Sequence, residues 1–226
     1  VALGAVALCA VLRPVARAEA GADARHITGT GNLVSNGQRI IIDNWDGDAG
    51  ISVRAWLAQS AAAGAPAGSR SAVLIGDRRT TARAVSRERC LALDLVGDAR
   101  LSDKGDGFTA SPGSRVLLIE RRGGVDREYT LEHGRGGKIR ESYSESGAAV
   151  TPEVKAAWLA DIIPVVMRQT GLGLEERVRR IRAEQGPGGV LAEARLVTNN
   201  AMRQEVLCDL LAEPGLPEAL VRDVVT

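Results

Sequence analysis

Two histidines, His26 and His133, are the residues of this sequence best suited to bind zinc or to exchange a proton near neutral pH. They stand at opposite ends of the region expected to form strands, so no His-x-x-x-His zinc pair exists. His133 lies in Glu132-His133-Gly134, which is typical of an exposed turn. We therefore predict a solvated histidine at this position, and we assign no metal-ligating residue.

Serine-hydrolase signatures are incomplete. Ser102-Asp103-Lys104 is one residue too short for the Ser-x-x-Lys motif of penicillin-binding proteins, and the Lys-Thr-Gly motif is absent. The Gly-x-Ser-x-Gly elbow is absent as well. The carboxylates are scattered, with no pair at a spacing that predicts acid–base catalysis. The sequence therefore yields no catalytic and no cofactor-binding residue.

A glycine-rich stretch, Gly134-Arg135-Gly136-Gly137-Lys138, partly matches a phosphate-binding loop. Glu132 stands where the loop needs a glycine, and Ile139 follows the lysine where serine or threonine is required. A strand is expected next, so no helix N-terminus would face an anion. We predict a tight turn between two strands.

Two groups of charged residues are interpreted as structural. The stretch Asn44-Trp45-Asp46-Gly47-Asp48 has the acidic spacing of a calcium loop but lacks its later ligands, so we expect a plain turn. Glu120-Arg121-Arg122 and Asp126-Arg127-Glu128 alternate in sign on either side of a predicted turn. We expect these side chains to pair across two strands on the solvent face of a sheet.

Composition limits the classes of function. The 226 residues have a net charge of +1 with scattered cations, and only 3% are aromatic, so neither a basic footprint nor stacking platforms for nucleic acid are present. Three cysteines, Cys9, Cys90 and Cys208, do not make a disulfide framework. Cys90 and Cys208 could pair in an exported domain only if the fold brings their backbones close together.

The first 20 residues suggest export. Val1 to Leu12 carry no charge, Arg13-Pro14 ends the apolar run, and Ala16-Arg17-Ala18 has the small-x-small pattern of a signal-peptidase site. The run is short for a bilayer span, but because the chain begins with valine and no basic segment precedes it, the end of a longer membrane helix is the alternative. Either hypothesis places Glu19 onward outside the cytoplasm, with membrane attachment through residues 1–18 in the second.

Residues 21–150 are expected to form an antiparallel β domain. Asn36-Gly37 suits the two-residue turn of a hairpin, and residues 61–71 (AAAGAPAGSRS) are expected to form a flexible loop. From Arg89 to Tyr143 apolar residues alternate, as at Leu91, Leu93 and Leu95, and glycine-rich turns separate the segments. The pattern predicts a β meander with one buried and one solvated face.

Residues 151–226 are expected to be helical. Thr151-Pro152-Glu153 is typical of a helix start, and Pro164 should kink the helix that follows. We expect its apolar stripe to comprise Val154, Trp158, Ile162 and Val166, with Trp158 anchoring the helix on the sheet. Glycines and prolines divide the remainder into helices beginning near Leu174, Val190, Met202 and Leu216, which suggests a HEAT-like array of short helices after the sheet. The predicted fold class is α+β.

Several stretches resemble a known family. Glu120 to Val125, Ala157 to Pro164, Thr170 to Gly173 and Glu176 to Ile181 are similar to the extracytoplasmic C-terminal region of Bla-regulator-type integral-membrane zinc peptidases and related exported proteobacterial proteins. The resemblance covers roughly residues 89–213. It implies a β platform followed by HEAT-like helices outside the membrane. The zinc site of such a parent lies in its membrane helices, so the resemblance supplies no catalytic residue here.

Three functional hypotheses follow. We favour a non-catalytic extracytoplasmic sensing or protein-interaction module with a protein partner in the cell envelope. This module is either the outer part of a membrane peptidase sensor or an exported stand-alone relative. The alternative is an exported helical-repeat scaffold that binds envelope proteins through its concave surface. The third is an unrecognised hydrolase.

Overall fold

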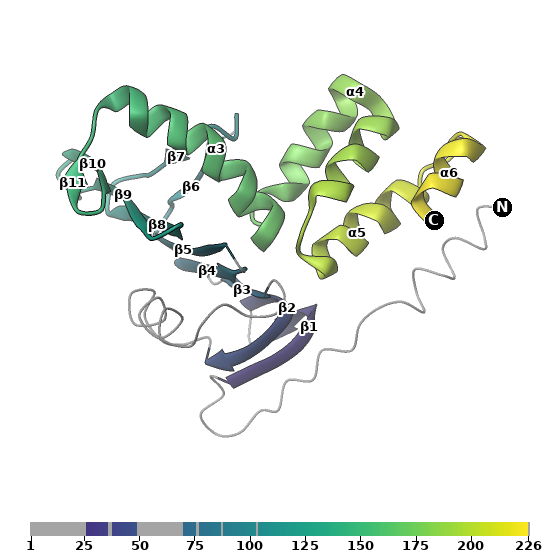
Figure 1. Ribbon diagram of the computed structural model, residues 1–226, viewed down its shortest axis with the longest axis horizontal. Coiled ribbons are helices and arrows are strands. Elements are labelled where there is room, and N and C mark those ends of the chain that lie inside the picture. Colours follow the sequence, from purple (N-terminus) through teal and green to yellow (C-terminus); the bar gives the residue numbers. More distant parts are fainter. Residues whose placement is uncertain are drawn as a thin grey trace.

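The computed structural model describes residues 26–35, 38–48 and 70–225, apart from residues 76, 87 and 103. Within these ranges the chain is α+β, with an antiparallel sheet followed by helices, as the sequence predicts. Figure 1 shows α3 (Pro152–Thr170) lying along the sheet and the later helices extending beyond it. The predicted leader, residues 1–20, lies outside the described residues, and none of the described helices is long and apolar enough to cross a membrane.

The main sheet has the order β1-β2-β3-β4-β5-β8-β9-β10-β11, so the strands follow each other as a meander. In the sequence between β5 and β8, two short strands, β6 and β7, pair with each other as a small second sheet. The strands are β1 (His26–Ser35), β2 (Gln38–Asp48), β3 (Arg70–Ile75), β4 (Arg79–Val85), β5 (Arg89–Val96), β6 (Arg100–Leu101), β7 (Phe108–Thr109), β8 (Ser114–Arg122), β9 (Val125–His133), β10 (Ile139–Glu145) and β11 (Ala148–Ala149).

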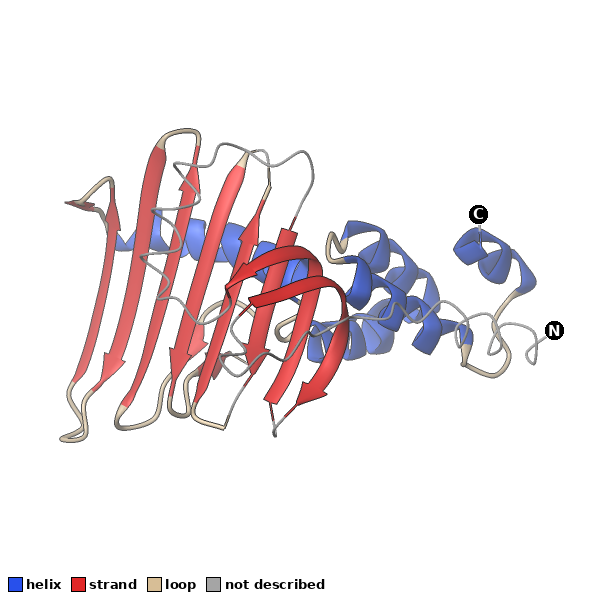
Figure 2. Cartoon of the chain, turned by 90° about the horizontal axis from the view of Figure 1, so that it is seen from below, coloured by secondary structure: helices blue, strands red, loops and turns tan. Residues whose placement is uncertain are grey.

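The first hairpin confirms one prediction and corrects another. The hairpin is present, because Ser35 pairs with Gln38. Asn36 and Gly37, which are predicted to form its turn, lie outside the described residues. The stretch from Asn44 to Asp48 is not a turn: it is the end of β2, because β1 continues to pair with it as far as His26. A register shift between Gly29 and Gly31 accompanies the bend of this hairpin, which is visible in Figure 2.

The predicted loop at residues 61–71 is also revised. Its residues 61–69 lie outside the described residues, but Arg70 and Ser71 already belong to β3. They are held there because β3 pairs with β2 on one side and with β4 on the other.

Alternation along the central strands buries one face of the sheet under α3. Leu91, Leu93 and Leu95 of β5 are buried on this helix face, and Leu93 lies opposite Leu118 of β8. Figure 2 shows α3 behind the strands, with the opposite face toward the viewer. We call the side away from α3 the outer face.

The helices are α3 (Pro152–Thr170), α4 (Leu174–Leu196), α5 (Asn200–Leu211) and α6 (Glu218–Val225). Thr151 caps α3 as predicted, because its side chain accepts a hydrogen bond from the Val154 backbone N–H. Val154 itself is 45% exposed and lies outside the buried stripe. The helix continues through Pro164. The helix expected at residues 190–196 is the second half of α4, which changes direction at the non-helical Gly186.

Trp158 docks α3 on the sheet. Its ring is 8% exposed and stacks on Tyr143 of β10 at a centroid distance of 4.9 Å. Its indole Nε1–H donates to Oε2 of Glu120 at 2.8 Å. Glu120, only 2% exposed, also lies 2.8 Å from Nε of Arg89, and 3.5 Å from a guanidinium nitrogen of Arg127.

The burial of Glu120 corrects the expectation that every charge around the β8–β9 turn lies on the solvent face. Arg121 and Asp126 do pair there, at 2.6 Å. Glu120 and Arg127 are one residue out of phase with that pair, so the pleat turns them toward α3.

The later helices attach at the other end of the sheet. The Asn199 side chain caps α5 by accepting from Met202 N–H and donates to the Ser71 hydroxyl of β3 at 2.9 Å. Buried Glu193 of α4 binds Arg168 of α3 and Arg177 of its own helix, at 2.9 and 2.8 Å. These contacts join both α3 and β3 to the distal helices.

Cys90 is a free thiol. It lies on β5, at the end of the sheet near Arg121, whereas Cys208 lies on α5. The pairing of Cys90 with Cys208 is therefore not formed. Burial raises the pKa of the Cys90 thiol, and the nearby Arg121 guanidinium offsets only part of this increase.

Replacing Trp158 tests how the two halves dock. Trp158→Ala removes a buried aromatic ring and should reduce the free energy of unfolding by about 3–5 kcal/mol. Trp158→Phe keeps a ring against Tyr143 but removes the N–H donated to Glu120, and should cost about 1–3 kcal/mol. Urea unfolding followed by circular dichroism measures both. A loss below about 1 kcal/mol for Trp158→Ala would contradict this docking.

Glu193 predicts a loss of stability in acid. Burial opposes its ionisation, but the Arg168 and Arg177 guanidiniums overcome this and lower the pKa from 4.5 to about 2. The ionised carboxylate therefore stabilises the fold above pH 4.5, and the contribution disappears as the pH falls from 4.5 toward 2. Urea unfolding across this range should show a steeper decline for the native chain than for Glu193→Gln. Parallel declines would rule out this contribution.

Candidate functional site

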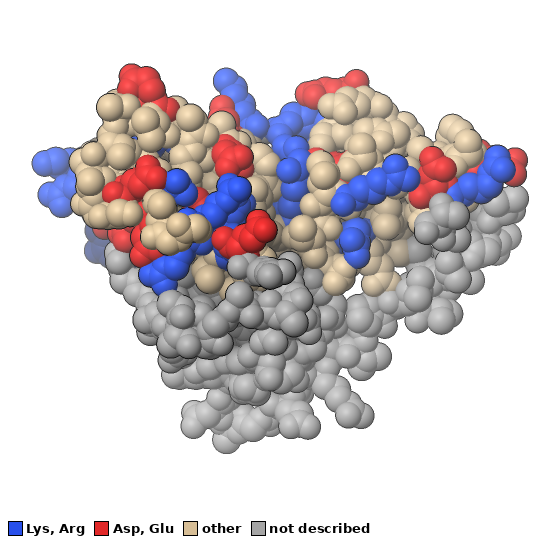
Figure 3. Space-filling view, viewed as in Figure 1, with Lys and Arg blue, Asp and Glu red and all other residues tan. Residues whose placement is uncertain are grey.

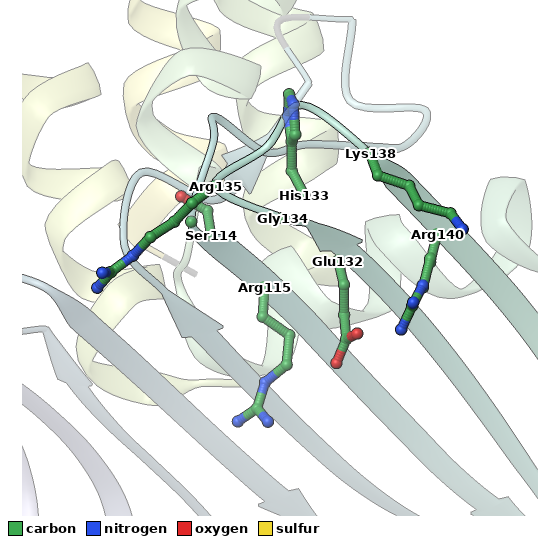
Figure 4. Close-up of a pocket in the computed structure, with 9 residues that line it drawn as sticks. Ser114, Arg115, Glu132, His133, Gly134, Arg135, Lys138 and Arg140 are labelled. Atoms are coloured by element: carbon green, nitrogen blue, oxygen red, sulfur yellow. The ribbon is translucent and has the colours of Figure 1, made fainter.

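A hollow of about 410 Å³ opens on the outer face, at the end of β8, β9 and β10 that lies beside the β9–β10 turn. Figure 4 shows its lining. The charged and imidazole side chains around it are Arg115, Glu132, His133, Arg135, Lys138 and Arg140. Four cations thus surround a single carboxylate. Elsewhere, on the face shown in Figure 3, acidic and basic side chains are interspersed.

Strand register places three of these residues in a row. Arg115 of β8 lies opposite Glu132 of β9, and Glu132 lies opposite Arg140 of β10. Residues in register on neighbouring antiparallel strands point to the same face of the sheet. Figure 4 accordingly shows all three side chains extending from the same side of their strands. The charges of this row alternate as positive, negative, positive.

Arg115 is held by a buried acid rather than by its neighbour in the row. Asp94 of β5 is 2% exposed, and it binds Arg79 at 2.7 Å and Arg115 at 3.2 Å. The hydrogen bonds that Arg79 donates to the Asp94 carboxylate raise the pKa of Arg79. Glu132 forms no ion pair within the described part of the chain. The row therefore leaves space between its side chains instead of closing into a salt-bridge ladder.

The glycine-rich stretch forms the rim of the hollow and is a tight turn, as predicted. Gly134 N–H donates to Lys138 C=O, and Gly137 N–H donates to Gly134 C=O, both at 2.9 Å. Gly137 has a φ of 80°, which favours glycine. Arg135 and Lys138 are exposed on this turn.

Three cations at the hollow have no ionic partner. Arg135, Lys138 and Arg140 are exposed, and within the described residues none of them forms a salt bridge or a side-chain hydrogen bond. Two of them come from the β9–β10 turn, and the third comes from β10. All three lie between residues 135 and 140, so their proximity follows from the local sequence. Strand register then adds Arg115 and Glu132 to the same end of the sheet, which no local motif reveals.

Ser114 and His133 also line the hollow, and they lie opposite each other in the β8–β9 register. The Ser114 hydroxyl, however, accepts the Asp98 backbone N–H at 2.9 Å. His133 Nδ1 lies 2.7 Å from the Ala110 carbonyl oxygen, and its ring points away from the Arg115–Glu132–Arg140 row in Figure 4. No hydrogen bond joins these two described residues, so the geometry is not that of a nucleophile with its base. His133 is half-buried rather than fully solvated as predicted.

Metal ligation has no structural support in the described ranges. No group of at least 3 His, Cys, Asp or Glu residues is placed there to hold an ion. Cationic side chains dominate the hollow, and a cation would be repelled by them. An anion, in contrast, would find guanidinium groups able to bind a carboxylate or phosphate through paired hydrogen bonds.

No family model matches this chain, and no curated protein or solved structure matches it either. The similarity to the outer region of membrane zinc peptidases therefore remains an interpretation of the sequence. The arrangement of charges at the end of β8–β10 is the feature on which a functional proposal can be built.

Proposed function

We propose that this chain is a non-catalytic protein-interaction module that works outside the cytoplasm, and that its partner binds the hollow at the end of β8–β10 through an acidic segment. One observation carries the proposal: Arg135, Lys138 and Arg140 line this hollow, and among the described residues none of them has an ionic partner. Arginine is enriched at protein interfaces, where its planar group binds carboxylates in a defined geometry.

The fold supplies a firm support for such a surface. Leu118 of β8 and Tyr129 of β9, which face α3, are buried. Arg115 is positioned by buried Asp94, which makes two hydrogen bonds to Arg79 and one to Arg115. Arg140 lies on β10, which pairs with β9, so it loses less conformational freedom on association than a residue of a mobile loop would.

The extracytoplasmic location is part of the proposal and rests on sequence. Support comes from the apolar stretch of residues 1–12, the small-x-small triplet at residues 16–18 and the resemblance over residues 89–213. In a sensing role, the protein would respond to the binding of a partner at the sheet and pass the signal to the membrane. Attachment through residues 1–18 would keep the hollow close to other envelope proteins.

Site-specific photo-cross-linking in the cells that produce the protein tests the proposal. p-Benzoylphenylalanine is placed at Gly136, at the rim of the hollow, and in a separate variant at Gly188 of α4. An added Cβ meets no atom within 4 Å at either glycine, so the two variants are matched controls. We expect a discrete protein adduct from the Gly136 probe and none of the same mass from the Gly188 probe.

The charge of the hollow provides the second arm of the test. Adding Arg140→Glu to the Gly136 probe variant should reduce the adduct by about tenfold, which corresponds to about 1.4 kcal/mol of binding free energy. Arg140 is exposed and has no partner in the part of the chain that the structure describes, so its replacement should change the free energy of unfolding by less than about 0.5 kcal/mol. No adduct at Gly136, or the same adduct at Gly188, would refute the assigned surface.

A further inference from the structure

Within the described residues, the outer edge of β10 is largely open. β10 pairs with β9 from Ile139 to Glu145. On its other side β11 pairs only with Ser144 and Glu145, so the part of the strand before them has no described neighbour. An edge of this kind presents backbone N–H and C=O groups that an extended peptide can bind.

The hydrogen-bond pattern identifies which backbone groups point outward. The β9–β10 ladder begins with the bond from Gly134 N–H to Lys138 C=O, and bonded and non-bonded pairs then alternate. Arg140 and Ser142 thus direct their backbone groups toward β9, whereas Ile139 and Glu141 direct theirs toward the open edge. No hydrogen bond in the described chain occupies the outward groups of these two residues.

The charge row specifies what should lie beside Arg140. Arg115, Glu132 and Arg140 alternate in sign across β8, β9 and β10. Opposite charges in register across strands stabilise a sheet, and like charges destabilise it. A further strand would therefore place a carboxylate opposite Arg140. The residue two positions further along this added strand lies on the same face and would reach Lys138.

The side of β10 that faces α3 indicates which residue of the added strand should stand between its two acidic residues. Ile139 is 61% exposed, so it offers an apolar contact to a neighbour in register. The Glu141 side chain is already engaged, because it accepts from Tyr129 at 2.9 Å and pairs with Lys155 at 2.7 Å. Glu141 thus contributes its backbone to the edge while its side chain stays bound to the fold.

A second copy of this chain fits the edge poorly. Two β10 strands related by a two-fold axis must pair residues with outward backbone groups, which allows few registers. In these registers Lys138 lies opposite Arg140 of the other copy, or the two copies of Arg140 lie opposite each other, or the two copies of Glu141 do. The register after these is blocked by β11. The occupant with complementary charge is an acidic segment of a different protein.

We propose that β10 binds an extended segment of the partner as an additional antiparallel strand, with the pattern acid–apolar–acid opposite Arg140, Ile139 and Lys138. This inference rests on the proposed function and names the ligand of the same site. It adds to that proposal a backbone ladder through Ile139 and Glu141, which charge attraction alone does not require.

The probe is a fluorescein-labelled peptide, Ser-Thr-Thr-Glu-Val-Glu-Thr-Ser, titrated with the full chain and followed by fluorescence anisotropy. In the proposed register the valine N–H bonds the Ile139 carbonyl, whereas the N–H of the glutamate before it points away from β10. N-methylation of the valine should therefore weaken binding by about tenfold or more, because it removes a ladder bond and adds a clash. N-methylation of that glutamate should change the affinity by less than about twofold.

Two protein variants separate the contribution of Arg140 from that of net charge. Arg140→Glu should weaken peptide binding by about tenfold. Arg122→Glu makes the same change in net charge at the opposite end of β8, where Arg122 is exposed, and should leave the affinity within about twofold. In hydrogen exchange, bound peptide should slow the amides of Ile139 and Glu141 and leave those of Arg140 and Ser142 unchanged.

The outcomes also separate this inference from the proposed function. Equal binding of both N-methylated peptides, or no binding of the parent peptide at about 1 mM, would overturn strand addition. Cross-linking at Gly136 would in that case still support a partner on this surface. Self-association that Arg140→Glu abolishes and the peptide does not displace would instead assign the edge to a second copy of the chain, which also overturns the inference.

Discussion

Glu120 is buried beneath α3, and the attachment of the helices to the sheet depends on how its charge is accommodated. One carboxylate oxygen lies 2.8 Å from Nε of Arg89, and the other accepts the Trp158 indole N–H at 2.8 Å with Arg127 nearby. A buried carboxylate without partners would cost several kcal/mol. Correct docking of α3 supplies one of these partners, so the same contact satisfies the charge and fixes where the helix lies.

This constraint determines which face of the sheet remains available. With Trp158 on Glu120 and Tyr143, and with Lys155 bound to Glu141, α3 covers the helix face of β8–β10. The outer face then carries the residues of opposite phase, including Arg115, Glu132 and Arg140. A one-residue shift in register would reverse this distribution, exposing apolar residues and burying the charged row. Packing of α3 therefore also positions the candidate binding site.

Local sequence signals predicted much of the architecture. Alternation at Leu91, Leu93 and Leu95 gave a strand with a buried face, and Thr151-Pro152 marked the start of α3. β4 has the sequence RTTARAV, in which small residues and arginine replace large apolar side chains, so its alternation is weak. It forms because it lies between β3 and β5. The residues of the Asn44–Asp48 segment likewise favour a turn, whereas pairing with β1 keeps the segment in β2.

The candidate site could not be predicted for a related reason. Arg115, Glu132 and Arg140 are separated in sequence by turns, and only strand register aligns them. The sequence also gives no means of distinguishing a charge that the fold uses from one that it leaves unpaired. Acids buried by the fold are matched in the structure: Glu120, Asp94 and Glu193 each contact at least 2 guanidinium groups. At the β9–β10 turn the balance is reversed, because exposed cations need no partner for folding. Their clustering around one hollow and one open strand edge among the described residues is thus not required by stability, and the proposed recognition of an acidic partner would give it a physical reason.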